Sequence, residues 1–214
     1  MAATMTERGR VDKRQAILEA AFTVFARRGY AQACVQEIAE VAAVAKPTVY
    51  NHFADKQTLF RHALTAAADA VLAANLTLVD RLRAPEPTLP EALAELAYRL
   101  AAGCCDERSR ALRWLTYSQV AQSPDLIDEV LRRTADRLGE ALADRFARLA
   151  LAGRIRITDP ARAAEVFLVL ITGPLEGRSR LGTRPVPPAE LRAMTTAAVD
   201  TFLRAYPDTT DEAR

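Results

Sequence analysis

Apolar residues recur along most of the chain at spacings of three and four, which is the period of an amphipathic helix. Near the N-terminus, Ile17, Leu18, Ala21, Phe22 and Phe25 form one such stripe. No segment of useful length alternates polar and apolar residues as a strand would. The pattern predicts an all-α chain of about nine helices, near residues 11–28, 35–42, 46–52, 55–83, 89–105, 107–122, 124–152, 158–181 and 188–206.

Glycine, proline and aspartate mark the expected helix ends. Gly29 is expected to end the first helix, because glycine adopts positive φ at little cost. Asp55 is a candidate N-cap for the long fourth helix. Three prolines between residues 85 and 90 predict a linker. Gly173 and Pro174 are expected to kink or break the eighth helix, and residues 1–10 to form a charged tail.

Two short helices, near residues 35–42 and 46–52, flank a three-residue turn. Helices of about seven residues are unstable alone and need a shared apolar plug. The residues spaced to supply it, packed against the first helix, are Ile38, Val44, Val49 and Phe53, with Phe22 and Phe25 opposite. This arrangement is typical of a helix-turn-helix, whose second helix enters the major groove of DNA.

The outward side chains of the second short helix suit nucleic acid. Lys46 can pair with a phosphate, and Thr48 and Tyr50 offer hydroxyls to a phosphate or a base edge. Asn51 and His52 add further donors, and Lys56 begins the next helix.

The ordered motif across this region resembles the DNA-binding signature of the TetR family. It reads Gly29-Tyr30, Val35-x-x-Ile38-Ala39, Val44-x-Lys46-Pro47-Thr48-Val49-Tyr50-x-His52-Phe53 and Lys56-x-x-Leu59. The resemblance implies a recognition helix at 46–52. The residues that it implies as DNA contacts are Lys46, Pro47, Thr48, Tyr50, His52 and Lys56.

A fainter likeness to the C-terminal domain of AefR-like regulators rests on four short matches. They are Asp159-Pro160, Ala163-Ala164, Phe167 and Gly173-Pro174. Together the two resemblances imply a homodimeric, ligand-responsive repressor that binds a palindromic operator on double-stranded DNA. The expected domains are 11–62 for DNA binding and 63–207 for effector binding and dimerisation.

Three residues depart from the family pattern. Ala43 replaces the usual turn glycine, where positive φ costs an alanine about 1 kcal/mol. Ala45 and Cys34 replace usual hydroxyl residues at helix starts, and a lost cap costs roughly 0.5–2 kcal/mol. Cys34 also removes an expected phosphate contact. We therefore expect the fold to be kept and the DNA affinity to be reduced.

Charge and composition agree with a DNA-binding head on a neutral body. Residues 1–62 carry nine Lys or Arg and six Asp or Glu, a net of +3, and the remainder has a net of −1. The mildly basic head suits a polyanion. There is no constellation for catalysis and no spacing for a metal or cofactor site, so the sequence predicts a protein that is not an enzyme.

Cysteine usage and hydropathy bear on location. The odd count of three cysteines is not that of a disulfide framework. Cys104 and Cys105 are either small apolar helix residues or a redox pair. The sequence shows no signal-peptide core and no apolar run near 20 residues, the longest candidate being 166–173. These features predict a cytoplasmic protein without a membrane partner.

A ligand cavity is expected between the helices at 107–122 and 158–181. Trp114, Tyr117 and Ser118 share a helix face, Gln122 extends it, and Phe167 would face them. The same face could instead be core. Arg113 beside Trp114 is either solvated or a partner for an acidic ligand.

Dimerisation is expected through the last two helices, which are apolar over much of their circumference. The candidate interface residues are Phe167, Leu170, Ile171, Met194, Ala198 and Phe202. The alternative is that both helices are central to the core of the monomer.

Two rival functions remain. One is a small helical enzyme, and the other is a helical interaction module that does not bind DNA. Sequence-dependent retention on DNA would separate both from a regulator.

Overall fold

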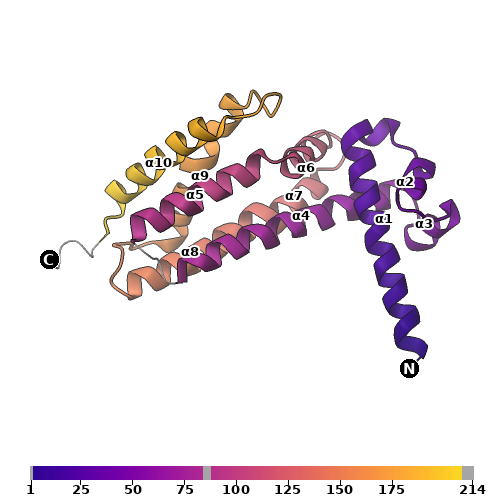
Figure 1. The fold of residues 1–214 in the computed structure, drawn as a ribbon, viewed down its shortest axis with the longest axis horizontal. Coiled ribbons are helices and arrows are strands. Elements are labelled where there is room, and N and C mark those ends of the chain that lie inside the picture. Colours follow the sequence, from indigo (N-terminus) through magenta and orange to yellow (C-terminus); the bar gives the residue numbers. More distant parts are fainter. Residues whose placement is uncertain (1, 84–87, 209–214) are drawn as a thin grey trace. The chain divides into compact units, whose positions relative to one another are not determined.

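The computed structural model describes residues 2–83 and 88–208, with side chains from Asp12 onward apart from that of Arg83. Its first helices are α1 (Ala2–Gln32), α2 (Val35–Val41), α3 (Lys46–His52), α4 (Lys56–Asp80) and the short 3-10 helix η1 (Arg81–Arg83). They are followed by α5 (Leu89–Cys105), α6 (Glu107–Tyr117), α7 (Pro124–Leu131), the π-helical η2 (Arg132–Asp136), α8 (Arg137–Leu151), α9 (Pro160–Arg178) and α10 (Pro188–Ala205) (Figure 1).

The all-α class is confirmed for the part of the chain that the structure describes. Its β pairing is limited there to an isolated antiparallel bridge between Ile155 and Asp208. Because α7, η2 and α8 follow one another without a break, they form the single helix expected at 124–152, with a π-helical insert. Counted in this way, the described residues form the nine helices that the hydrophobic pattern predicts.

Most helix ends lie where local signals predict them. Gly29 leaves helical geometry at φ 73°, and Gly153 ends α8 at φ 66°. The carboxylate of Asp159 accepts a hydrogen bond from the Arg162 amide at 3.0 Å, which caps α9. Three expectations were wrong: α1 begins at Ala2 instead of near residue 11, α6 ends at Tyr117 instead of near 122, and α9 is not broken at Pro174. The alternative of a kink at Pro174 stays a prediction.

The chain forms two compact units. The first comprises Met1–Ala70 and Ala111–Arg133, and the second comprises Val71–Arg110 and Thr134–Arg214. Both α4 and α6 therefore contribute residues to both units. The first unit includes a segment, Ala111–Arg133, that lies well outside the residues expected to bind DNA.

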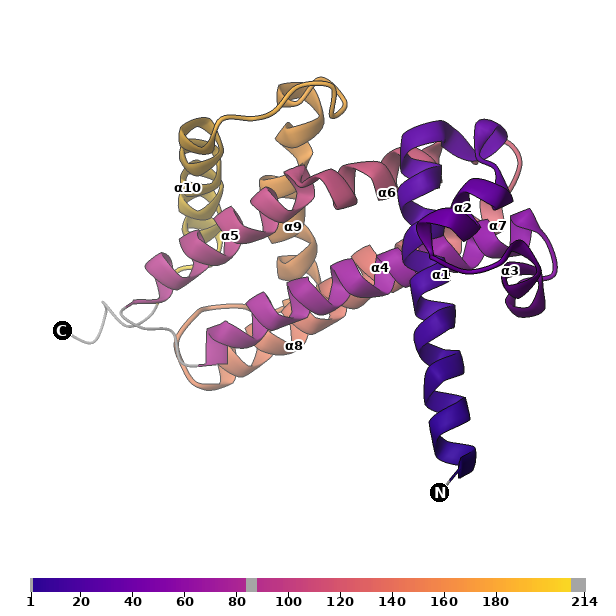
Figure 2. The same ribbon diagram turned by 45° about the vertical axis from the view of Figure 1, so that its right-hand side comes forward.

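The core of the second unit is centred on three phenylalanine rings. Phe167 lies edge-on to Phe146 and Phe202, with ring centroids 5.6 and 5.1 Å apart. These rings come from α9, α8 and α10, and α10 also packs along α5 (Figure 2). At the edge of the unit, Asp80 of α4 pairs with the buried Arg145 of α8 at 3.1 Å. The three rings therefore hold α8, α9 and α10 together.

The fourth helix corrects one expectation from hydropathy. By length and composition α4 is apolar enough to cross a membrane, although the sequence was expected to contain no such segment. Core helices of soluble proteins pass the same test. One side of α4 is buried in the described structure, with Leu59 and Leu64 in the first unit and Leu72 and Val79 in the second. Because 33% of the apolar window is buried in this way, length and composition alone make α4 weak evidence for a membrane span.

Candidate nucleic-acid interface

The helix pair α2–α3 is held by the predicted apolar plug. Ile38, Val49 and Phe53 are buried, and Val44 is half-buried. Phe22 and Phe25 of α1 are buried in the same unit, and α1 packs against α2. Ala39 is also buried, as expected of a small residue where two helices approach closely. The seven residues of α3 contribute one buried side chain, Val49, to this core.

An aromatic cluster joins the end of α1 to the start of α4. The Phe60 ring lies 4.9 Å from that of Phe25 and 4.8 Å from that of Tyr30, centroid to centroid. Lys56 lies over the Tyr30 ring, with Nζ 4.8 Å from its centroid, and donates a hydrogen bond to the Ala31 carbonyl at 3.1 Å. A cation–π contact and a hydrogen bond therefore fix Lys56, an expected DNA contact, beside Tyr30.

The turn between α2 and α3 carries backbone strain at the predicted position. Ala43 has φ 53°, a left-handed conformation that favours glycine. Its amide donates to the Glu40 carbonyl at 3.1 Å, and the Val44 amide donates to the Ala39 carbonyl at 2.9 Å. This is the Schellman pattern, which satisfies the last carbonyls of α2. The turn therefore keeps the family geometry without the glycine.

The helix starts also follow the expected pattern of caps. Neither Cys34 before α2 nor Ala45 before α3 makes a side-chain capping bond. By contrast, the Asp55 carboxylate accepts a hydrogen bond from the Thr58 amide at 2.7 Å, at the start of α4. This bond from the Thr58 backbone, with a second from the Thr58 hydroxyl, lowers the pKa of Asp55 below its usual 3.8.

The outward face of α3 carries the residues expected to contact DNA. Lys46, Pro47 and Asn51 are exposed, as is Tyr50 with 45% of its surface accessible. Thr48 and His52 are half-buried, and so is Lys56 at the start of α4. Six of the seven expected residues thus lie on one short helix, and Lys56 lies beyond the bend that follows it.

One further cation near α3 was missed by sequence reasoning. The guanidinium carbon of Arg14, on α1, lies 5.2 Å from the ring centroid of Phe53, the residue that ends α3. The sequence motif begins at Gly29 and so did not include Arg14. Arg27 and Arg28 at the end of α1 both pair with Glu37 of α2, the latter at 3.5 Å, which links the first two helices.

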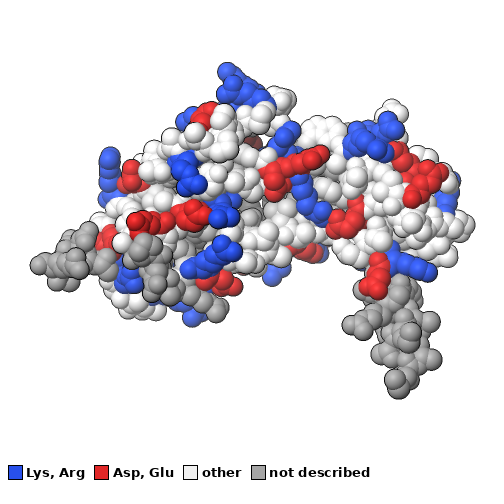
Figure 3. Space-filling model, viewed as in Figure 1, with Lys and Arg blue, Asp and Glu red and all other residues white. Residues whose placement is uncertain are grey.

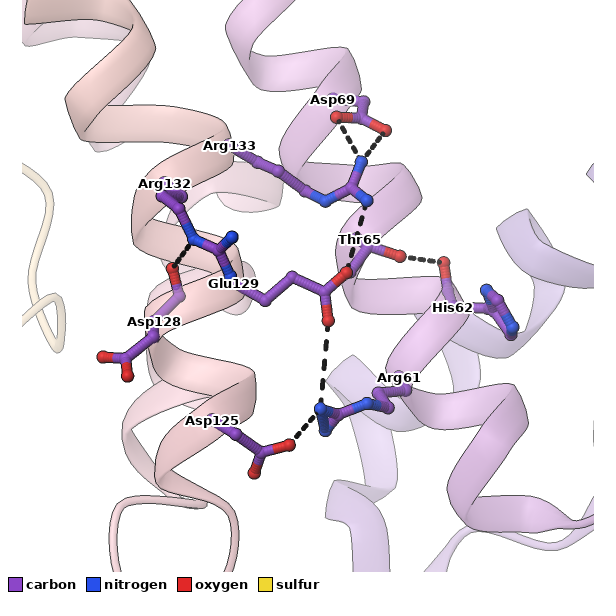
Figure 4. Close-up of polar contacts among 9 residues, drawn as sticks. All are labelled: Arg61, His62, Thr65, Asp69, Asp125, Asp128, Glu129, Arg132 and Arg133. Atoms are coloured by element: carbon purple, nitrogen blue, oxygen red, sulfur yellow. Dashed lines mark hydrogen bonds and ion pairs between the residues drawn. The ribbon is translucent and has the colours of Figure 1, made fainter.

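In the same unit as the helix-turn-helix, a cluster of ion pairs connects α4 to α7 and η2 (Figure 4). Arg61 pairs with Asp125 and lies 3.9 Å from Glu129. Arg133 pairs with Asp69 at 2.9 Å and with Glu129 at 3.2 Å. Arg133 therefore links α4 to α7.

The two histidines have no catalytic surroundings among the described residues. The pKa of His62 is lowered, first by partial desolvation of the ring and then by the charge of Arg14. In the same part of the chain, no group of three or more His, Cys, Asp or Glu side chains could hold a metal ion.

Cys104 and Cys105 are half-buried beside an apolar cluster of the second unit that includes Leu175 and Leu191.

The expected ligand residues are divided between the two units. Trp114, Tyr117 and Ser118 lie in the first unit, and the two aromatic side chains are 55% and 52% exposed. Phe167 lies in the core of the second unit and is 1% exposed. Trp114 and Ser118 do line a cavity, which is formed within the first unit.

The expected dimer residues are mainly core residues of the second unit. The five that are buried within the subunit are Phe167, Ile171, Met194, Ala198 and Phe202, and Leu170 is half-buried. This burial agrees with the alternative that the last two helices are central to the monomer's core. Val169, on the outer face of α9, is 60% exposed.

Charge is evenly mixed over the face of the molecule drawn in Figure 3. Lysine and arginine side chains alternate there with aspartate and glutamate, and no large area has a single sign. The coloured residues on this face therefore form no broad positive patch. On this face, phosphate contacts would therefore have to be made by single, separately placed cationic side chains.

Comparisons with known proteins agree with this geometry. Residues 17–63 match the family described as bacterial regulatory proteins of the TetR family, and residues 91–208 match the C-terminal domain of AefR-like transcriptional repressors. No curated protein sequence matches the chain.

Solved structures share the fold over nearly the whole chain. A protein from Mesorhizobium loti, assigned to the TetR family of transcriptional regulators, is 29% identical over 92% of this chain and 98% of its own, with a TM-score of 0.87. A TetR transcriptional regulator from Agrobacterium tumefaciens is 26% identical over 91% and 94%, with a TM-score of 0.66. The flavonoid-responsive regulator FrrA, 23% identical over 91% and 96%, has a TM-score of 0.65. The chain therefore belongs to the TetR family of bacterial transcriptional regulators, with an N-terminal helix-turn-helix and an AefR-like C-terminal domain.

Proposed function

We propose that this chain is a repressor that binds a palindromic operator as a homodimer and releases it when a small effector binds. Residues 11–62 would read the DNA, and residues 63–207 would mainly serve the dimer and the response. The protein would act in the cytoplasm, where the operator is. We propose no catalytic activity for this protein.

The observation that carries DNA binding is the outward face of α3. This helix buries Val49 and presents Lys46, Tyr50 and Asn51 to solvent. A helix of about this length can lie in the major groove, where amide and hydroxyl groups read base edges and lysine pairs with phosphate. We assign Lys46 to a phosphate, and Tyr50 and Asn51 to phosphate or base edges. Pro47, Thr48, His52 and Lys56 would border the contact.

Homodimerisation is proposed through the outer faces of α9 and α10. Val169 is a large apolar residue exposed on α9, and Ala193 and Ala197 lie exposed on α10. Two helices from each copy can form a four-helix bundle about a two-fold axis. That symmetry would present two α3 helices to two half-sites of a palindrome.

Repression is supported by the C-terminal domain that the chain matches, which is described as that of AefR-like transcriptional repressors. A repressor that releases its operator needs a ligand with different affinity for the free and the DNA-bound forms. FrrA is flavonoid-responsive, but its identity to this chain is only 23%, so the likeness concerns the fold.

The proposal is tested by an electrophoretic shift of the intergenic DNA beside the protein's own gene. We expect retention of this fragment and not of a scrambled duplex of the same composition. Tyr50→Ala and Lys46→Ala should each weaken retention about tenfold, as expected for a lost base or charged phosphate contact. Tyr117→Ala removes an equally exposed tyrosine from α6 and is the matched control. Equal retention by all four proteins would show that α3 does not bind the DNA.

Salt dependence gives an independent measure of the phosphate contacts. Each neutralised phosphate contributes about −0.9 to the slope of log affinity against log salt concentration. Wild-type binding should therefore weaken steeply with salt, and Lys46→Ala should make the slope shallower by about one. A flat titration of the wild type would contradict binding through phosphate contacts.

A further inference from the structure

The first unit contains a cavity of about 540 Å³ that the proposed function does not use. It is formed by the end of α1, the first turns of α4, and the segment from α6 to α7, all within that unit. Its volume is in the usual range for small-molecule sites. We call it the head cavity, defined by Arg28, Tyr30, Arg61, Trp114, Ser118 and Gln122 among its wall residues.

The early end of α6 creates one wall of this cavity. Instead of continuing to about residue 122, the chain turns after Tyr117, with amide hydrogen bonds from Gln119 to Thr116 and from Gln122 to Gln119, each 3.0 Å long. This turn places Ser118 and Gln122 in the wall. The Ser118 hydroxyl donates to the Leu115 carbonyl at 2.7 Å and accepts from the Gln119 side-chain amide at 3.1 Å, which leaves it one further lone pair. A continuous helix would have distributed these polar side chains around its circumference.

Aromatic side chains form a second part of the wall. Trp114 is 55% exposed, which is high for the largest apolar side chain, and Tyr30 and Phe60 lie in the same lining. The indole approaches Gly29 closely, because a Cβ added there would be 3.4 Å from Cη2 of Trp114. The indole therefore packs at van der Waals distance from the break of α1 at Gly29. Exposed aromatic surface in a hollow is typical of ligand sites.

The charges of the wall are all positive. Arg28 and Arg61 are part of it, and none of the described residues that line it is an aspartate or glutamate. Both ion pairs of Arg61 in the α4–α7 cluster are made through Nη2, whereas a guanidinium has donors on three nitrogens. The pairs with Asp125 and Glu129 (Figure 4) orient the guanidinium of Arg61, which is one of the residues that line the cavity. Such an oriented guanidinium suits a ligand carboxylate.

We propose that the head cavity binds a planar aromatic carboxylate, with its ring against Trp114 and Tyr30 and its carboxylate between Arg28 and Arg61. Ser118 and Gln122 would hydrogen-bond polar substituents of the ring. The site lies in the DNA-binding unit, not between the helices at 107–122 and 158–181 where a ligand was expected. The inference deepens the effector response in the proposed function. Its test involves no DNA, so each can fail without the other.

The experiment uses the full chain with fluorinated tryptophan, because the single tryptophan of the sequence is Trp114. We expect naphthoate to shift the one fluorine resonance saturably. Naphthamide, which has the same rings but no charge, should bind at least about fivefold more weakly, since a charge-assisted hydrogen bond is stronger than a neutral one.

A matched pair of arginine variants locates the carboxylate. Arg27 and Arg28 both pair with Glu37, but only Arg28 lines the cavity. Arg28→Gln should weaken naphthoate binding about five- to tenfold, and Arg27→Gln should leave it within about twofold of wild type. Three results would each overturn the proposal: no saturable shift, equal binding of the amide, or equal losses in the two variants. Heat of binding without a fluorine shift would place the ligand elsewhere and overturn it too.

Discussion

The recognition helix α3 and the C-terminal helices α9 and α10 use their side chains in opposite ways. In α3 the one buried side chain is Val49, whereas α9 buries five side chains and α10 buries six. A seven-residue helix cannot be stable alone, so α3 depends on its neighbours in the fold, α2 among them. In return, its outward face remains available to a ligand as large as DNA.

The C-terminal helices show the converse. Their apolar circumference suggested a dimer interface, but the structure uses most of it inside the subunit, around Phe146, Phe167 and Phe202. A helix that is apolar on most sides is first of all a central helix. Surface function therefore has to be sought in residues such as Val169 that stay exposed after the core is filled.

The strongest test of this difference is truncation of a core ring. Phe202→Ala removes a fully buried ring from between Phe146 and Phe167, whose centroids lie 5.3 and 5.1 Å away. We expect a loss of about 3–5 kcal/mol in the free energy of unfolding, measured by urea titration. Val169→Ala on the exposed face should change it by less than about 0.5 kcal/mol. Similar losses would mean that the outer face of α9 is also packed in solution.

The second test concerns that outer face in the assembled protein. Wild type is expected to have about twice the chain mass of 23.4 kDa by light scattering at micromolar concentration. The Val169→Arg variant should have the mass of a single chain, because burying an unpaired charge in the interface is costly. Leu151→Arg, at the 89% exposed end of α8, is the control and should remain dimeric. A wild type with a single chain mass would refute the dimer.

A smaller effect is expected in the turn between α2 and α3. Ala43→Gly relieves the positive φ of 53° and should stabilise the protein by about 0.5–1 kcal/mol. Ala42→Gly, one residue earlier at φ −77°, has no such strain to relieve and should destabilise it by a similar amount. Thermal melts of the two variants measure the sign. The same sign for both would show that the strain at Ala43 is absent in solution.

The smallest expected effect is the pH dependence of the cap at Asp55. Its folded pKa is lowered by the hydrogen bond from the Thr58 amide, so the charged cap stabilises the fold above the unfolded pKa of about 3.9. This stabilisation is lost as the pH falls through the lowered folded value. Asp55→Asn keeps an acceptor that does not titrate. Wild type should therefore lose stability relative to Asp55→Asn in acid melts, and parallel curves would contradict the role of the charge.

Local signals determined much of the fold from the sequence alone. The bounds of α3 and α5 were predicted to the residue, and the break at Gly29 occurs with positive φ as expected. The strained turn at Ala43 and the missing caps at Cys34 and Ala45 were also foreseen. Such features depend on interactions within a few residues, which a sequence displays directly.

Tertiary structure alone decided which distant segments meet. Arg133 and Asp69 are 64 residues apart and form an ion pair, although a charge on a helix face gives no sign of its partner. The segment after Tyr117 leaves the helix and lines a cavity with the end of α1, so Trp114 and Ser118 meet Arg28 and Arg61 instead of Phe167. Periodicity shows that a helix has an apolar face, but the residues which cover that face depend on packing across the whole chain.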